Sequence, residues 1–201
     1  MKSLFLDTSA NYINVYLIEN NEVVYSESLT VLKDMSNKIV PLIRKSFESV
    51  SFSINDLDKI FVTIGPGSFT GVRIGLTFAK TVAWGLNIPI YPISTLEFLA
   101  SVHTNKKRVI SIIDARRGNV FAGYYDCNLN KLDSEHLIPF SSIDILDDDL
   151  LVSYDGIYDS YKLDIDIIKL INKHKDDLPV NPHDLVPNYL KKTEAEEKLH
   201  D

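Results

Sequence analysis

The sequence predicts an α/β protein in which one pattern of strands and helices occurs twice. Residues 3–29 and 108–137 follow the same order: an apolar strand that ends in Asp, a short loop, an aromatic-rich strand, an Asn-rich turn and a third strand. The run "KIFVTI" at 59–64 is continuously apolar, as in a strand that is covered on both faces of its sheet. A glycine-rich loop and a long apolar segment follow this run. Internal similarity of this kind predicts two related lobes.

Composition limits the classes of protein to consider. The chain has 201 residues, of which 45% are hydrophobic and 24% charged, as in ordinary globular proteins. The net charge of -7 argues against a large basic surface and against tight, autonomous binding of nucleic acid. The single cysteine, Cys127, excludes an intrachain disulfide. The first apolar run breaks at Asp7 and no stretch is long enough to span a bilayer. We therefore expect a cytoplasmic protein without a membrane segment.

The first lobe is expected to begin with three strands, over residues 2–8, 12–19 and 22–29, with Asn20 and Asn21 forming a tight turn. A helix is predicted over 34–50, because one helical stripe collects the apolar residues Ile39, Ile43, Phe47 and Val50, with Val40 beside it. Pro41 fits near the start of this helix if the helix begins at Asn37 or Lys38.

The rest of the first lobe follows from capping signals. The strand at 59–64 leads through the glycine loop into a helix that ends near Leu86, and residues 88–93 read as a short strand. Ser94, with Glu97 three residues later, predicts a capping box at the start of a helix over 94–101.

The second half of the chain repeats this outline less completely. The polar stretch "HTNKKR" at 103–108 predicts the boundary between lobes at 1–103 and 107–201. A helix is expected over 159–174, followed by a charged tail. A three-strand meander followed by helix, strand and helix, occurring twice with the second lobe reduced, is the outline of the duplicated actin-like ATPase or ribonuclease-H-like fold (ASKHA superfamily).

Five motifs spread over nearly the whole chain carry a family resemblance. They are "FLDTS" at 5–9, "GPGSFTGVRIG" at 65–75, "ISTLEFLA" at 93–100, "IDARRGNVF" at 113–121 and "VPNYLKK" at 186–192. With these motifs the chain resembles the TsaB (YeaZ) family, in which "GPGSFTG" followed by the spaced Arg and Gly is the most specific element. The family belongs to the pathway that makes threonylcarbamoyladenosine at position 37 of tRNA.

The resemblance implies a non-catalytic subunit. A TsaB-like protein pairs with its catalytic paralogue TsaD, helps to recruit the TsaE-like ATPase, forms a homodimer in isolation and meets tRNA only through the complex. It implies no cofactor for this chain alone, and leaves ATP as a ligand of the complex interface. The chain departs from the family at Met35-Ser36-Asn37, where many relatives have His-Ser-Glu.

The glycine loop and the first strand end form a candidate phosphate site. Asp7, Thr8, Ser9, Gly65, Gly67 and Ser68 are candidates for a vestigial nucleotide or anion site, because the first hairpin loop approaches nucleotide phosphates in actin-like ATPases and helix N-termini attract anions. The other interpretation, which the sequence favours, is that Asp7 and Ser9 bond local backbone N–H groups, and that Ser68 or Thr70 caps the helix.

The matching loop of the second lobe is expected to be degenerate. Active relatives of this fold use Asp-x-Gly, whereas this chain has Asp114-Ala115-Arg116, with Gly118 four residues after the Asp. Arg116 and Arg117 have two interpretations: they bind an anion, or they pair with carboxylates across the cleft or a subunit interface, which the acidic chain favours.

The helix after the glycine loop indicates a partner interface, because it is apolar around most of its circumference. Together with the stripe on the first helix it predicts a helical patch for a partner, with Gly75 allowing a close helix–helix approach. The residues predicted to form this interface are Ser36, Ile39, Val40, Ile43, Arg73, Gly75, Leu76, Thr77 and Lys80.

No catalytic or metal-binding residue is predicted. The five histidines have no ligand-like spacing, and no Ser/His/Asp order or zinc motif supports peptidase activity. Two alternatives of the enzyme class are an independent actin-fold ATPase or sugar kinase and a glycoprotease-like metallopeptidase. The altered second loop argues against the first, and the missing ligands argue against the second.

Overall fold

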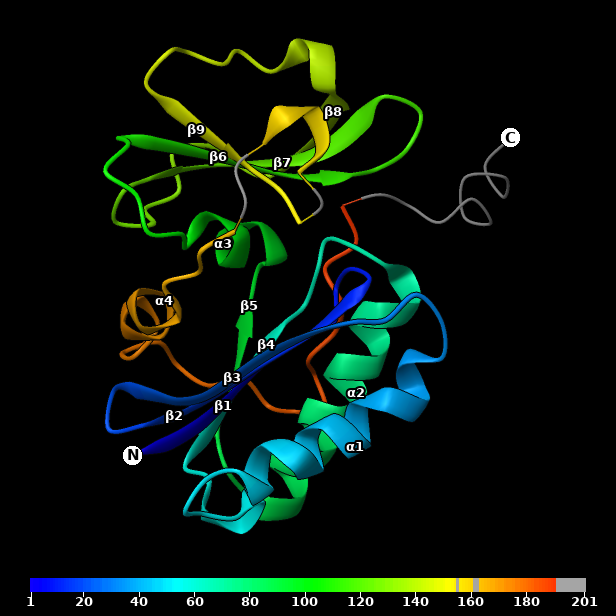
Figure 1. The fold of residues 1–201 in the computed structure, drawn as a ribbon, viewed down its shortest axis with the longest axis vertical. Helices are drawn as coiled ribbons and strands as arrows, with labels where there is room; N and C mark the ends of the chain where they lie inside the picture. The colour runs from blue at the N-terminus through cyan, green and yellow to red at the C-terminus, as the bar shows by residue number, and fades with distance from the viewer. Residues whose placement is uncertain (155, 161–162, 191–201) are drawn as a thin grey trace.

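The computed structural model describes residues 1–154, 156–160 and 163–190. The first lobe is a five-stranded sheet in the order β3-β2-β1-β4-β5. Its elements are β1 (Lys2–Asp7), β2 (Tyr12–Glu19), β3 (Glu22–Thr30), α1 (Met35–Glu48), a 3-10 turn (Ile54–Asp56), β4 (Lys59–Thr63), α2 (Phe69–Leu86), β5 (Ile90–Ile93) and α3 (Thr95–Ala100). Figure 1 shows this lobe below a second, smaller sheet.

The three predicted N-terminal strands are confirmed. Asn20 and Asn21 join β2 to β3 with φ angles of 51° and 69°, the left-handed pair that a tight hairpin turn requires. β4 lies parallel to both β1 and β5, and all its residues are buried. Its continuous apolar run therefore marks a strand covered on both faces, as expected.

Helices α1 and α2 cover one face of the first sheet (Figure 1). The apolar side chains of the two helices and of this sheet face form the first core. The prediction that Pro41 stands near the start of the first helix is wrong, because α1 begins at Met35 and holds Pro41 in its interior. Pro41 is exposed, so its missing N–H lies on the water side of the helix. Burial of Ile39, Leu42 and Ile43 stabilises the helix across this position.

The second lobe has the sheet order β8-β7-β6-β9, which repeats the first four strands of the first sheet. Its elements are β6 (Arg108–Asp114), β7 (Asn119–Asp126), β8 (His136–Pro139), a 3-10 turn (Phe140–Ser142), β9 (Asp149–Val152), a second 3-10 turn (Ile157–Asp159) and α4 (Ile167–Lys173). This topology confirms the duplicated fold with a reduced second lobe. The sequence analysis did not predict β9, and the helix predicted over 159–174 is much shorter.

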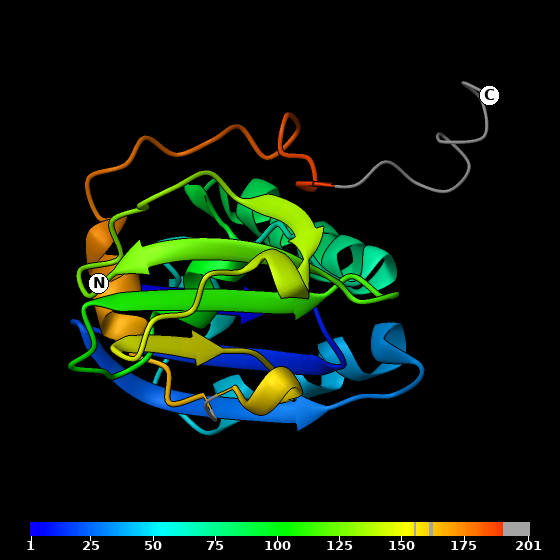
Figure 2. The same ribbon diagram turned by 90° about the horizontal axis from the view of Figure 1, so that it is seen from above.

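A second core lies between the two sheets. α3 packs on β6 and β7, and α4 packs beside it (Figures 1 and 2). The predicted helix start at Ser94 is confirmed, since Ser94 caps α3 by accepting a bond from the Leu96 N–H, but the capping box is wrong because Glu97 bonds Lys173 and His174 instead. Glu97 is buried, and its bonds to these two residues join α3 to the end of α4.

The chain after α4 returns to the first lobe. We name residues 178–190 the C-terminal strap. Val180 bridges to Ile90 on the edge strand β5, the Asn188 N–H bonds the Ile64 carbonyl, and Leu185 enters the first core. The strap runs beside α2 (Figure 1). The lobe boundaries stay a prediction, and the predicted charged tail lies mostly outside the described residues.

Candidate functional site

The Asp7 carboxylate, at the end of β1, lies at the centre of the junction between the lobes. Its Oδ1 accepts bonds from the Ser9 N–H at 3.1 Å, the Ser9 hydroxyl at 2.5 Å and the Thr63 hydroxyl at 2.7 Å. Its Oδ2 accepts bonds from Asn14 and from the Tyr154 hydroxyl, both at 2.7 Å. Asp7 is fully buried, and these five donors satisfy its carboxylate without a ligand.

Tyr154 is the partner that sequence reasoning missed, because it is 147 residues away in the chain and carries no local signal. It reaches Asp7 from the second lobe, directly after β9, and its hydroxyl also lies 2.9 Å from the Ser9 hydroxyl. Burial, followed by the charge of Asp7, raises the pKa of Tyr154 well above 10.0. The hydroxyl therefore remains a proton donor that joins the two lobes.

Close approach of the β1–β2 loop explains Gly67 and Gly71, and close approach of the strap explains Gly65. A Cβ at Gly67 would lie 2.2 Å from the Ser9 carbonyl oxygen, and one at Gly71 would lie 2.1 Å from the Thr8 carbonyl oxygen. A Cβ at Gly65 would lie 2.7 Å from the Asn188 carbonyl oxygen of the strap. These positions are glycine because other segments of this chain approach the backbone there. The Ser68 side chain caps the helix by accepting a hydrogen bond from the Gly71 N–H, as the capping interpretation of the sequence predicted.

The predicted role of Gly75 at a partner interface is corrected by its surroundings. Gly75 is buried, and a Cβ there would lie 2.2 Å from the Thr8 hydroxyl of the same chain. Ile39, Ile43 and Leu76 are each 3% exposed and belong to the first core. Gly75, Ile39 and Leu76 therefore offer a partner almost no free area in this conformation, whereas Ile43 lines the apolar pocket described below.

The other predicted interface residues do reach the surface of α1 and α2. Ser36, Arg73 and Thr77 are exposed, Lys80 is half-buried, and Val40 is 52% exposed. We name the outer surface of the two helices the α1–α2 face. Its role in binding a partner stays a prediction.

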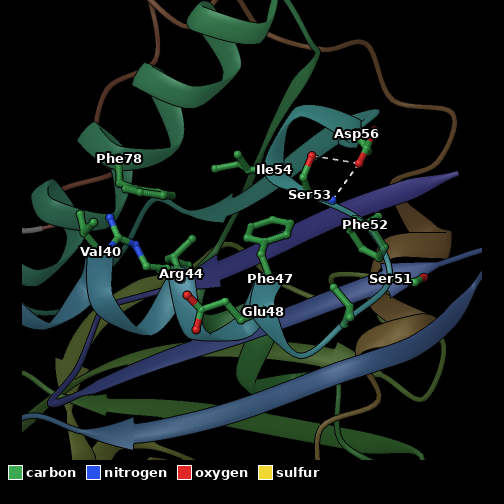
Figure 3. A pocket seen from close by; sticks show the side chains of 12 residues that line it. Val40, Arg44, Phe47, Glu48, Ser51, Phe52, Ser53, Ile54, Asp56 and Phe78 are labelled. Carbon is green, nitrogen blue, oxygen red and sulfur yellow. Dashed lines mark hydrogen bonds between the residues drawn. The ribbon is translucent and has the colours of Figure 1, made fainter.

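An apolar pocket of about 670 Å³ opens on the α1–α2 face. Figure 3 shows Val40 and Phe47 of α1, Phe78 of α2, and Phe52 and Ile54 of the following turn around it. Arg44, Glu48 and Asp56 stand at its rim (Figure 3). Apolar area concentrated in a surface pocket is typical of a site that receives an apolar side chain.

Part of the C-terminal strap borders the same face. The Lys80 ammonium donates to the Leu185 carbonyl at 2.8 Å, and the Arg73 guanidinium donates to the Tyr189 hydroxyl at 2.7 Å. Arg73 also stacks on Phe69, with 3.8 Å between the guanidinium carbon and the ring centroid. Arg73 and Lys80, which were predicted to contact a partner, therefore bind the strap of the same chain. Residue spacing in the sequence did not reveal these contacts.

A second pocket, of about 520 Å³, lies in the cleft between the lobes. Ser9, Gly67 and Ser68 line it from the first lobe, and Asp114 and Arg116 line it from the second. The structure thus brings part of the predicted vestigial site to the cleft, while Asp7 and Thr8 are turned into the protein. Binding of a nucleotide or anion in the cleft stays a prediction.

The matching loop of the second lobe is exposed. Arg116 and Arg117 adopt positive φ angles of 69° and 56°, and the Asp114 side chain accepts the Arg116 N–H at 2.8 Å. Neither guanidinium forms an ion pair within the described parts of the chain, so the predicted pairing across the cleft is not found there.

Residues 1–154, 156–160 and 163–190 contain no group of three or more His, Cys, Asp or Glu side chains placed to hold a metal ion. None of their helices combines the length and hydropathy that a bilayer-spanning segment needs.

Comparison with known families adds a direct match. The model of the family described as "TsaD: tRNA N6-adenosine threonylcarbamoyltransferase" matches residues 30–143, which is more than half of the chain. Proteins called "tRNA threonylcarbamoyladenosine biosynthesis protein TsaB" are also similar. The one from Bacillus subtilis is 39% identical over 149 residues, covering 73% of this chain and 64% of the relative. The one from Escherichia coli is 32% identical over 133 residues, covering 65% of this chain and 57% of the relative.

The chain thus spans less than two thirds of the length of these relatives. Among solved structures, YeaZ from Pseudomonas aeruginosa superposes with a TM-score of 0.82 at 24% identity, covering 94% of this chain and 99% of that one. At this identity the likeness is evidence for the fold alone.

Proposed function

The chain belongs to the TsaB (YeaZ) family, and on that premise we propose that it is a non-catalytic subunit in the biosynthesis of threonylcarbamoyladenosine at position 37 of tRNA. It binds a TsaD-like catalytic paralogue through the α1–α2 face and helps to recruit a TsaE-like ATPase. In isolation the same face forms a homodimer. The complex works in the cytoplasm, where it provides the contacts to ATP and tRNA.

The observation that carries this proposal is the α1–α2 face. Val40 is exposed beside an apolar pocket, on two helices that pack together over the first sheet. A paralogue with the same fold presents a comparable pair of helices, so a self-complementary helical contact can form between two copies or between the two paralogues.

The junction between the lobes supports a role without catalysis. In an ATPase of this fold, the carboxylate after the first strand must be free to face phosphate or metal-bound water. Here five donors of the same chain occupy the Asp7 carboxylate. We therefore expect no ATP turnover by the purified chain.

Matched exposed apolar residues test the proposed face. Val40 on α1 is 52% exposed and Leu132 in the second lobe is 53% exposed. Val40→Glu introduces a charge into the proposed contact and should abolish the complex with the TsaD-like protein, whereas Leu132→Glu should leave it intact. Light scattering gives the mass of each mixture, and circular dichroism shows that both variants fold. A Val40→Glu chain that still forms the complex would disprove the proposed interface.

A further inference from the structure

The charges of α1 and α2 differ from those of the chain as a whole. The chain carries a net charge of -7. The two helices carry one carboxylate, Glu48, and five cations: Lys38, Arg44, Lys45, Arg73 and Lys80. Their net charge is therefore +4, and the remainder of the chain carries -11.

Most of these cations are not neutralised internally. Lys45 pairs with Glu27 at 2.7 Å. The other four form no ion pair within residues 1–154, 156–160 and 163–190. Lys80 and Arg73 bond carbonyl and hydroxyl oxygens, which leaves their positive charge uncompensated. Two carboxylates, Glu48 and Asp56, lie at the pocket rim, and Asp56 bonds Ser53.

We infer that the partner for which the α1–α2 face is built is a protein surface that combines carboxylates with apolar side chains. The apolar side chains occupy the pocket, and the carboxylates lie opposite Lys38, Arg44, Arg73 and Lys80. Two copies of this chain that meet face to face bring like charges together. This inference rests on the proposed function, because it assigns a chemistry to the partner of the same face.

The pocket favours a protein over a nucleic acid. Phosphate groups are bound by cations and N–H groups and gain nothing from a pocket lined by Val40, Phe47, Phe52 and Phe78. An apolar side chain in such a pocket, surrounded by complementary charges, is the usual arrangement at the centre of a protein–protein interface.

Ionic strength tests the inference, because it should act in opposite directions on the two assemblies. Salt at about 20 mM screens charges far less than salt at about 500 mM. The rate of association with the TsaD-like protein should be at least about tenfold higher at the lower salt. The homodimer should instead dissociate more at the lower salt, measured by analytical ultracentrifugation.

Charge reversal on the α1–α2 face is a second test, and the same reversal elsewhere on the surface is its matched control. Lys38 and Arg44 are exposed and form no side-chain hydrogen bond or ion pair with any residue that the structure describes, so Lys38→Glu/Arg44→Glu should fold normally. It should slow association with the TsaD-like protein at low salt by about tenfold or more and lose that difference at high salt. The control Lys107→Glu/Lys175→Glu makes the same change on exposed residues outside both helices and should have little effect.

The outcomes separate the two proposals. If no complex with the TsaD-like protein forms at either salt concentration, both the proposed function and the acidic partner are overturned. If the complex forms at the same rate at both salt concentrations, the inference of an acidic partner is overturned but the proposed function is not. The same holds if both double variants change the association rate equally. Displacement of the partner by unmodified tRNA would assign the face to nucleic acid.

Discussion

The two lobes place an Asp at the same point of the repeat, yet its surroundings differ completely. Asp7 ends β1, is fully buried and receives five hydrogen bonds. Asp114 ends β6, is exposed and caps the backbone N–H of Arg116. In the first lobe the N-terminus of α2 packs on the loop after Asp7. After β9 the second lobe has a 3-10 turn in place of that helix.

This comparison teaches that equivalent positions of a duplicated fold are not equivalent sites. The first loop has become an internal joint between a helix, a hairpin and Tyr154 of the opposite lobe. The second loop remains at the surface, where arginines adopt a backbone conformation that glycine would adopt more easily. Four predictions test this contrast.

Replacing the two aspartates should give the largest difference. Asp7→Ala leaves buried donors from Ser9, Asn14, Thr63 and Tyr154 without an acceptor, and should lower the free energy of unfolding by about 4 kcal/mol. Asp114→Ala removes one exposed bond and should change it by about 0.5 kcal/mol or less. Urea denaturation measures both values, and equal losses would show that the loops are alike.

Adding a methyl group to a glycine of each lobe should give the next largest difference. Gly71→Ala puts a Cβ against the Thr8 carbonyl oxygen and should cost about 2–3 kcal/mol through overpacking. Gly118→Ala has no atom within 4 Å of its Cβ, so only its φ of +76° opposes it, at about 1 kcal/mol. Thermal unfolding compares the two. A Gly71→Ala chain as stable as Gly118→Ala would contradict the close approach.

The bond that crosses between the lobes should have a smaller effect. Tyr154→Phe removes the hydroxyl from Asp7 and should lower the free energy of unfolding by about 1–2 kcal/mol. The pKa of Tyr154 is raised above 10.0 in the folded chain, so the unfolded chain loses this proton first. The stability that the hydroxyl contributes is therefore present below pH 10 and decreases above it. A difference between the two chains that grows above pH 10 would contradict this.

The smallest expected effect comes from restoring Asp-x-Gly in the second lobe. Arg116→Gly relieves a left-handed backbone and should raise the free energy of unfolding by about 0.5–1 kcal/mol. It should produce no ATP turnover, because Asp7 remains occupied by its five donors. A coupled ATPase assay checks this, with Arg117→Gly as the neighbouring control. Turnover in the Arg116→Gly chain would show that this loop alone had silenced the site.

Much of the fold could be predicted because its signals are local. Alternating and continuous apolar runs indicated β1 to β4, two asparagines indicated the first hairpin, and the repeated order indicated the second sheet. β9 was missed because it has only four residues, begins with the last of three consecutive aspartates (147–149) and forms no periodic pattern long enough to read. Glu97 satisfied the spacing of a capping box, but bonds to Lys173 and His174 of a distant helix replaced that role.

The candidate site divides in the same way. Local sequence signals indicate that Asp7 and the glycine loop lie together, that α1 and α2 carry much apolar area, and that the second loop lacks its glycine. Three contacts are visible only in the folded chain: Gly75 accommodates Thr8, Tyr154 bonds Asp7, and the strap borders α2. Periodicity specifies which face of an element is apolar, whereas the segment that covers that face can lie a hundred residues away and leaves no trace in local spacing.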